Sequence, residues 1–161
     1  MPKMVVYVVV TCLDQMGWLQ PAGQKQAEGA GRLVATDLTR NCLKPAEGPL
    51  VMISAQDSAS VASAAYLSVG LGYDRLSLTT NSDLDGRGDG LCSDLARDEV
   101  MGMEEEVAFI VAPYNAVLAM LSGLKDWEDL QERGIRQGEV FAIDHEGRPN
   151  EPDTIQVRRL S

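Results

Sequence analysis

The chain has 161 residues, of which 45% are hydrophobic and 24% charged, and its formal net charge at pH 7 is -10. This length suits one domain with a sizeable core, and we expect a single domain over residues 1–161. The negative charge argues against nucleic acid and anionic membranes as partners, because both attract cationic surfaces. The longest apolar run, residues 4–10, is far shorter than the roughly 20 residues of a membrane-spanning helix, and it lacks the flanks of a signal peptide.

Cysteine usage restricts the chemistry further. The three cysteines are Cys12, Cys42 and Cys92, and none lies in a Cys-x-x-Cys motif. An odd number of widely spaced cysteines is typical of free thiols in a reducing compartment. We therefore expect a cytoplasmic protein without a zinc site or a disulfide framework, and no motif in the sequence indicates a cofactor.

Apolar strands alternate with amphipathic helices along the chain. The predicted order is a buried strand at 4–10, a helix at 21–38, a strand at 49–54, a helix at 58–70, a strand at 75–79, a strand at 107–112, a helix at 113–123, a short helix at 126–133 and a closing hairpin within 138–159. Pro21 and Pro113 suit first helical turns, and Asp57 suits an N-cap. The alternation predicts an α/β fold in three layers, with a mostly parallel sheet between helices on both faces.

Small polar residues follow three of the predicted strands. In parallel α/β sheets, ligands bind beyond the carboxyl ends of the strands. The residues that we expect to line such a pocket are Thr11, Cys12, Asp14, Ser54, Ser58, Tyr114 and Asn115.

Three segments in this order carry a family resemblance. Residues 19–27 follow an L-T-x-x-G-x-x-Q-A pattern in part, residues 54–63 follow S-x-x-x-R-A-x-x-T-A in part, and residues 111–115 stand where a V-S-H segment is expected. The chain resembles the histidine phosphatase superfamily, with its phosphoglycerate mutase-like fold, in the short phosphohistidine-phosphatase form. The resemblance covers Val5 to about Asp144 and retains scaffold residues such as Gly23, Gln26 and Ala59.

The catalytic residues that the resemblance implies are replaced. The family's first strand ends in Arg-His-Gly, whose histidine is the nucleophile, and here Thr11 falls on the arginine and Cys12 on the histidine. Ser58 falls on a second arginine and Pro113 on a second histidine, so neither position supplies a cation to hold phosphoryl oxygens. The only histidine of the chain is His145, expected in the turn of the closing hairpin. A mechanism that uses two histidines is therefore excluded in any alignment.

Two function classes follow from this replacement. We expect a catalytically inactive pseudo-phosphatase that binds an unknown partner protein or a small ligand, and the sequence leaves a homodimer open. The alternative is a divergent phosphatase or hydrolase with Cys12 as nucleophile and Asp14 or Asp57 as acid/base. That mechanism needs donors or cations that lower the pKa of the thiol, and the sequence predicts none beside Cys12.

An acidic segment bears on both readings. Residues 83–106 hold nine acidic residues against Arg87 and Arg97. In the resembling family this segment lies near the pocket mouth, where its charge would repel an anionic substrate. Residues 81–86, NSDLDG, match the first six positions of a calcium loop, but the twelfth position is Cys92 instead of glutamate. A cation-binding protein is thus the third and weakest reading, with at most weak binding at 81–92.

Overall fold

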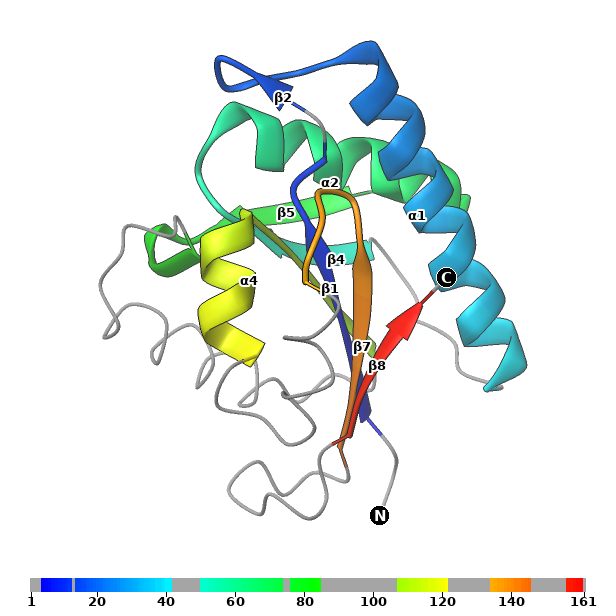
Figure 1. Ribbon diagram of the computed structural model, residues 1–161. Helices are drawn as coiled ribbons and strands as arrows, with labels where there is room; N and C mark the ends of the chain where they lie inside the picture. The colour runs from blue at the N-terminus through cyan, green and yellow to red at the C-terminus, as the bar shows by residue number, and fades with distance from the viewer. Residues whose placement is uncertain are drawn as a thin grey trace.

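The computed structural model describes residues 4–12, 14–41, 50–73, 76–84, 107–121, 134–145 and 156–160 (Figure 1). Its strands are β1 (Met4–Val10), β2 (Asp14–Gln15), β3 (Trp18–Leu19), β4 (Leu50–Ser54), β5 (Leu76–Thr80), β6 (Val107–Ala112), β7 (Val140–His145) and β8 (Gln156–Leu160). Its helices are α1 (Pro21–Arg40), α2 (Ser58–Leu71) and α4 (Tyr114–Leu121), with one 3-10 turn, η1 (Ser82–Leu84).

Six strands form one sheet in the order β5-β4-β6-β1-β7-β8. The strands β5, β4, β6 and β1 pair in parallel, whereas β7 runs antiparallel to both of its neighbours. A short antiparallel pair, β2 and β3, follows β1 outside this sheet. The predicted mixed, mostly parallel α/β fold is confirmed.

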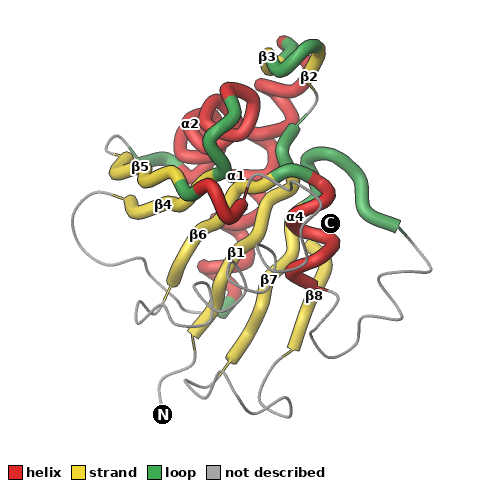
Figure 2. Tube along the Cα trace, turned by 90° about the vertical axis from the view of Figure 1, so that its left-hand side faces the viewer, coloured by secondary structure: helices red, strands yellow, loops and turns green. Residues whose placement is uncertain are grey.

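Helices cover both faces of the sheet, as Figures 1 and 2 show. On one face, Val34 of α1 and Leu67 of α2 pack against Tyr7 of β1 and Phe109 of β6. The other face packs against α4, which contributes Ala116, Val117, Met120 and Leu121 to the second core. The run at 4–10 is apolar on both sides because its residues alternate between these two cores.

The backbones of α1 and α2 touch at two glycines. A Cβ atom added at Gly31 would lie 2.3 Å from the carbonyl oxygen of Leu67, and one added at Gly70 would lie 2.0 Å from that of Glu28. Any larger residue at either position would separate the helices, because backbone atoms cannot move aside as a side chain does. These glycines therefore set the spacing of the two helices above the sheet.

A buried ionic network ties β8 to the middle of the fold. Arg158 donates to both carboxylate oxygens of Asp37 at 2.9 and 3.1 Å, and also to Asp144 on β7. The Tyr7 hydroxyl on β1 donates to Asp37 at 2.6 Å. Burial would raise the pKa of Asp37, but the bonds from Arg158 and Tyr7 outweigh it, so the pKa is lowered. The Asp37 carboxylate thus joins α1 to β1 and β8, and Arg158 extends the network to β7.

The structure differs from the sequence expectations at several places. His145 is not a turn residue, because it closes β7 and pairs with Met4 of β1. The β2–β3 hairpin was not expected, and α1 continues to Arg40, two residues beyond its predicted end. The short helix expected at 126–133 lies outside the described residues. Within the described part of the chain, no helix combines the length and apolar character needed to cross a membrane.

Candidate functional site

The carboxyl ends of β4, β6 and β1 lie side by side at one edge of the sheet. Beyond the strands, the Thr11 amide donates to the carbonyl of Ala112, and the Ala55 amide donates to that of Val111, both at 2.9 Å. These bonds hold the first residues after β1 and β4 against the end of β6. The structure therefore brings together the chain segments that carry Thr11, Cys12, Ser54 and Pro113.

A chain of hydroxyl groups runs from Thr11 to the start of α2. The Ser60 hydroxyl donates to Asp57 at 2.7 Å, and the oxygen atoms of Thr11 and Ser60 lie 2.6 Å apart. Because Ser60 has a single hydroxyl proton and gives it to Asp57, Thr11 must be the donor to Ser60. Asp57 also accepts the Ser60 amide at 3.0 Å, which confirms it as the N-cap of α2. Thr11 and Ser60 are both buried, so their hydroxyls face each other and not an open pocket.

Cys12 is fully buried, at 0% exposure. Its amide donates to the Ser63 hydroxyl at 3.1 Å, while its thiol contacts the carbonyl oxygen of Val10 at 4.0 Å. Burial raises the pKa of the Cys12 thiol to about 11, although the bond to Ser63 lowers it in part. At neutral pH about one molecule in ten thousand would therefore carry a thiolate at this position.

The remaining predicted residues differ in how far they are enclosed. Asp14 begins the β2–β3 hairpin and accepts a bond from the Gln137 side chain at 2.9 Å. Ser54 is buried, and its hydroxyl donates to the neighbouring carbonyl of Ala55. Ser58, Tyr114 and Asn115 are exposed at the first turns of α2 and α4.

No described cation is bonded to the predicted site residues at these strand ends. Within the described ranges, no lysine or arginine forms a hydrogen bond or ion pair with Thr11, Cys12 or Ser58. The described residues also hold no cluster of three metal-ligating side chains. Most of the loop at 81–92 lies outside the described residues, so its weak cation binding stays a prediction.

Two residues of this site escaped the sequence analysis. The sequence placed Ser60 and Ser63 in the predicted helix at 58–70 and indicated no contact for either of them. In the structure they form the contacts to Thr11 and Cys12. The available signal was their spacing, because Asp57, Ser60 and Ser63 recur every third residue and so share one face of α2.

Solved structures with low sequence identity share this arrangement of strands and helices. No family model matches the sequence, and no curated protein is similar enough to count as a relative. A protein of Agrobacterium tumefaciens assigned as the phosphohistidine phosphatase SixA superposes with a TM-score of 0.69 at 12% identity, over 98% of this chain and 97% of that one. Phosphoglycerate mutase from Plasmodium falciparum superposes with a TM-score of 0.67 at 13% identity, over 97% and 89% of the two chains.

The chain has the phosphoglycerate mutase-like fold. A mycobacterial glucosyl-3-phosphoglycerate phosphatase shares it, with a TM-score of 0.57, 15% identity and coverage of 99% of this chain and 97% of that one. The resemblance seen in the sequence is therefore confirmed at the level of the fold. Identities this low leave the chemistry of the strand-end site to its own residues.

Proposed function

We propose that this chain is a catalytically inactive, histidine phosphatase-like domain that works by binding and not by phosphoryl transfer. The observation that carries the proposal is the bonding at the strand ends, where Thr11, Cys12, Ser60 and Ser63 are buried against one another. Neutral side chains fill the place where the resembling family presents a nucleophile and its cations.

The chemistry of phosphoryl transfer explains why this arrangement is unsuitable. The transferring group carries negative charge on three oxygens, which an enzyme stabilises with cations or oriented donors. The Thr11 hydroxyl is already donated to Ser60, and the Ser63 hydroxyl is donated to the carbonyl of Ala59 at 2.7 Å. An incoming phosphate would find these donors in use and no charged partner among the described residues.

The divergent enzyme with Cys12 as nucleophile is the weaker candidate. A thiol phosphatase needs an accessible sulfur with a lowered pKa. Cys12 is enclosed, and burial raises its pKa to about 11. Asp14 and Asp57, the two acid/base candidates of this mechanism, already accept hydrogen bonds from Gln137 and Ser60.

The surface around the strand ends supports the binding role. Tyr114 is 42% exposed at the start of α4, and the hairpin after β1 displays Met16 and Trp18, which are 92% and 70% exposed. Large apolar side chains of this kind are common anchors in protein interfaces. We therefore infer a protein partner or a small ligand, in the cytoplasm, and no nucleic acid or membrane partner.

Turnover of an aryl phosphate at high protein concentration tests the proposal. The wild-type chain, Cys12→Ala and an active phosphatase of the same fold would be assayed together from pH 5 to pH 9. We expect the wild type and the variant to be equal and at background, while the active phosphatase turns over. Activity that disappears in Cys12→Ala would establish the thiol enzyme instead. Activity that survives the substitution would refute the loss of catalysis without supporting the cysteine.

A further inference from the structure

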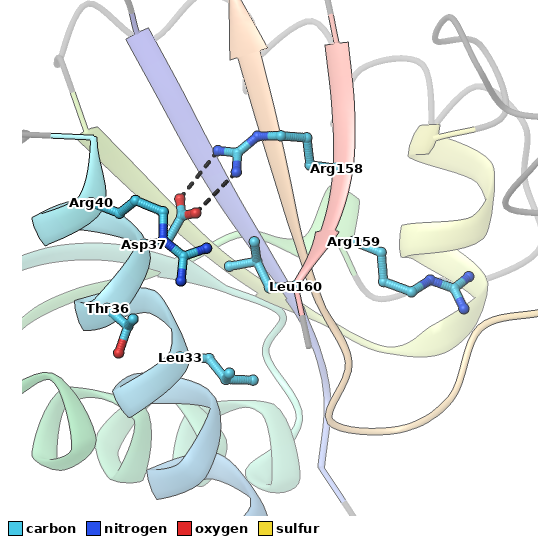
Figure 3. Close-up of a pocket in the computed structure, with 7 residues that line it drawn as sticks. All are labelled: Leu33, Thr36, Asp37, Arg40, Arg158, Arg159 and Leu160. Atoms are coloured by element: carbon cyan, nitrogen blue, oxygen red, sulfur yellow. Dashed lines mark hydrogen bonds and ion pairs between the residues drawn. The ribbon is translucent and has the colours of Figure 1, made fainter.

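A groove separates the second half of α1 from the edge strand β8, away from the strand ends described above. Its volume is about 220 Å³. The lining residues are Leu33, Thr36, Asp37, Arg40, Arg158, Arg159 and Leu160 (Figure 3).

The lining follows from two periodicities. Residues 33, 36, 37 and 40 are three or four apart and so share one face of α1. Arg158 and Leu160 alternate with Arg159 along β8, which places them on the face toward α1. Figure 3 shows the Arg159 side chain pointing away from the groove, where it pairs with Glu139 at 3.2 Å.

Of the two arginines that face the groove, Arg40 has no described carboxylate bonded to it. Asp37 accepts both of its ionic hydrogen bonds from Arg158, and Asp144 on β7 shares the same guanidinium from outside the groove. Arg40 is exposed and forms no hydrogen bond or ion pair with a described residue, although its charge helps to lower the pKa of Asp37. The two arginines and the two carboxylates sum to zero, so the positive character of the groove is local to Arg40.

The two arginines also have N–H groups that remain available as hydrogen-bond donors. The Nη1 atom of Arg158 carries two protons and donates one of them to Asp37, while Nε and Nη2 are used for Asp37 and Asp144. One N–H of Arg158 and the whole fork of Arg40 thus lack a described acceptor. A planar carboxylate is an acceptor whose geometry matches arginine donors.

Apolar side chains supply the rest of the groove. Leu33 approaches from α1 and Leu160 from the end of β8, as Figure 3 shows. The volume is below the range of drug-sized ligand sites, so the occupant is a small molecule. The lining therefore complements a small molecule with one charged end and one short apolar part.

We propose that the groove between α1 and β8 binds a small monocarboxylate with a short apolar chain. Its carboxylate bonds to Arg40 and to the available Arg158 N–H, and its chain lies between Leu33 and Leu160. The site goes beyond the binding role proposed for the strand ends and does not depend on it. A single negative charge is preferred, because Asp37 and Asp144 oppose a second one.

Hexanoate is a suitable probe, titrated against the wild-type chain and followed by the backbone amide resonances and the melting temperature. We expect saturable shifts at Thr36, Arg40 and Leu160 and a rise in melting temperature with hexanoate concentration. Hexan-1-ol keeps the apolar chain without the charge and should bind at least about tenfold more weakly. Hexylammonium and inorganic phosphate should bind no better than hexan-1-ol, since one has the wrong charge and the other has no apolar part.

Two arginines of α1 provide a matched pair of variants. Arg40→Gln removes the charge that lines the groove, while Arg32→Gln removes an exposed charge of the same helix outside the lining. We expect Arg40→Gln to weaken hexanoate binding at least about tenfold and Arg32→Gln to change it less than about twofold. Equal losses in both variants would reduce the effect to general electrostatics and overturn the site.

The titration of the wild-type chain with hexanoate also tests the proposed site without any variant. Absence of saturation up to about 50 mM hexanoate would overturn the proposal. Saturable shifts confined to Thr11, Cys12 and their neighbours would overturn it too, because they would place the ligand at the strand ends. Cys12→Ala should leave hexanoate binding unchanged, which separates this test from that of the proposed function.

Discussion

Replacing Asp37 tests the network that joins α1 to β1, β7 and β8. Its side chain is 6% exposed and accepts one bond from Tyr7 and two from Arg158. Asp37→Ala would leave the buried Tyr7 hydroxyl without its described acceptor and would leave Arg158 to Asp144 alone. Asp37→Asn keeps an oxygen for one of these donors but loses the charge.

The contacts set the size of the effect. Hydrogen bonds to a charged group contribute about 1.5–3 kcal/mol, and a buried hydroxyl without a partner costs about 1–3 kcal/mol. These terms overlap, and solvent screens Arg158, whose side chain is 34% exposed. We therefore expect Asp37→Ala to lower the free energy of unfolding by about 2–4 kcal/mol and Asp37→Asn by about half of that.

The pH dependence of this effect has a definite sign. Because the pKa of Asp37 is lowered on folding, its charge stabilises the folded state above the unfolded pKa of about 3.9. That stabilisation is lost as the pH falls through the folded pKa. The difference between wild type and Asp37→Asn should thus be constant near neutral pH and should shrink below about pH 4.

Urea unfolding followed by far-ultraviolet circular dichroism measures these differences. Glu28→Gln is the matched control, since it removes an acidic charge from the same helix at a half-buried position. It should change the free energy of unfolding by less than about 0.5 kcal/mol. A value for Asp37→Ala within about 0.5 kcal/mol of this control would refute the account of the network.

Three further predictions concern the helix contact, the thiol and the N-cap. Gly70→Ala should cost about 1–3 kcal/mol of unfolding free energy because its Cβ would meet the Glu28 carbonyl. Gly29→Ala, whose Cβ meets nothing within 4 Å, should instead gain up to about 1 kcal/mol, and urea unfolding in which both variants gain would contradict the close approach. In a chain with Cys42→Ser and Cys92→Ser, native Cys12 should react with iodoacetamide at pH 8.5 at least about 100-fold more slowly than the same chain in urea, and equal rates would contradict the burial argument. Asp57→Ala should cost about 1 kcal/mol, measured by urea unfolding, and Asp57→Asn should cost less because it keeps an acceptor for the Ser60 amide; equal stability of the two variants would argue against the cap.

Much of the fold was predictable from periodicity and helix signals. The continuous apolar runs at 4–10 and 107–112 indicated strands buried on both faces, and both lie at the centre of the sheet. The spacing of Ala27, Ala30 and Val34 predicted α1, because it places these residues on one helix face. Local patterns of this kind need no knowledge of the partner element.

The rest depends on contacts between distant residues. Asp37 and Arg158 are 121 residues apart, and neither has a local pattern that predicts the pairing. The hairpin after β1 turns at Met16, whose φ of 54° lies in a region that propensity reserves for glycine and asparagine. Its apolar side chains Met16 and Trp18 face solvent, whereas side chains of this kind are usually buried.

The strand-end site was predictable in its location but not in its content. Strand order and direction brought Thr11, Ser54 and Pro113 to one edge of the sheet, as the parallel arrangement implied. Their bonding depends on Ser60 and Ser63, which the sequence analysis passed over. A serine in a helix is too common to indicate which strand end it contacts.

The position of β1 has a consequence for how the chain is made. Val5 is synthesised well before its two partners in the sheet, which are Val107 on one side and Asp144 on the other. Until β6 has been synthesised, no described strand pairs with this apolar segment, and such unpaired strands are prone to aggregate. The nascent chain therefore carries this apolar stretch unpaired until β6 has been made, which makes β1 the segment that a chaperone would have to shield.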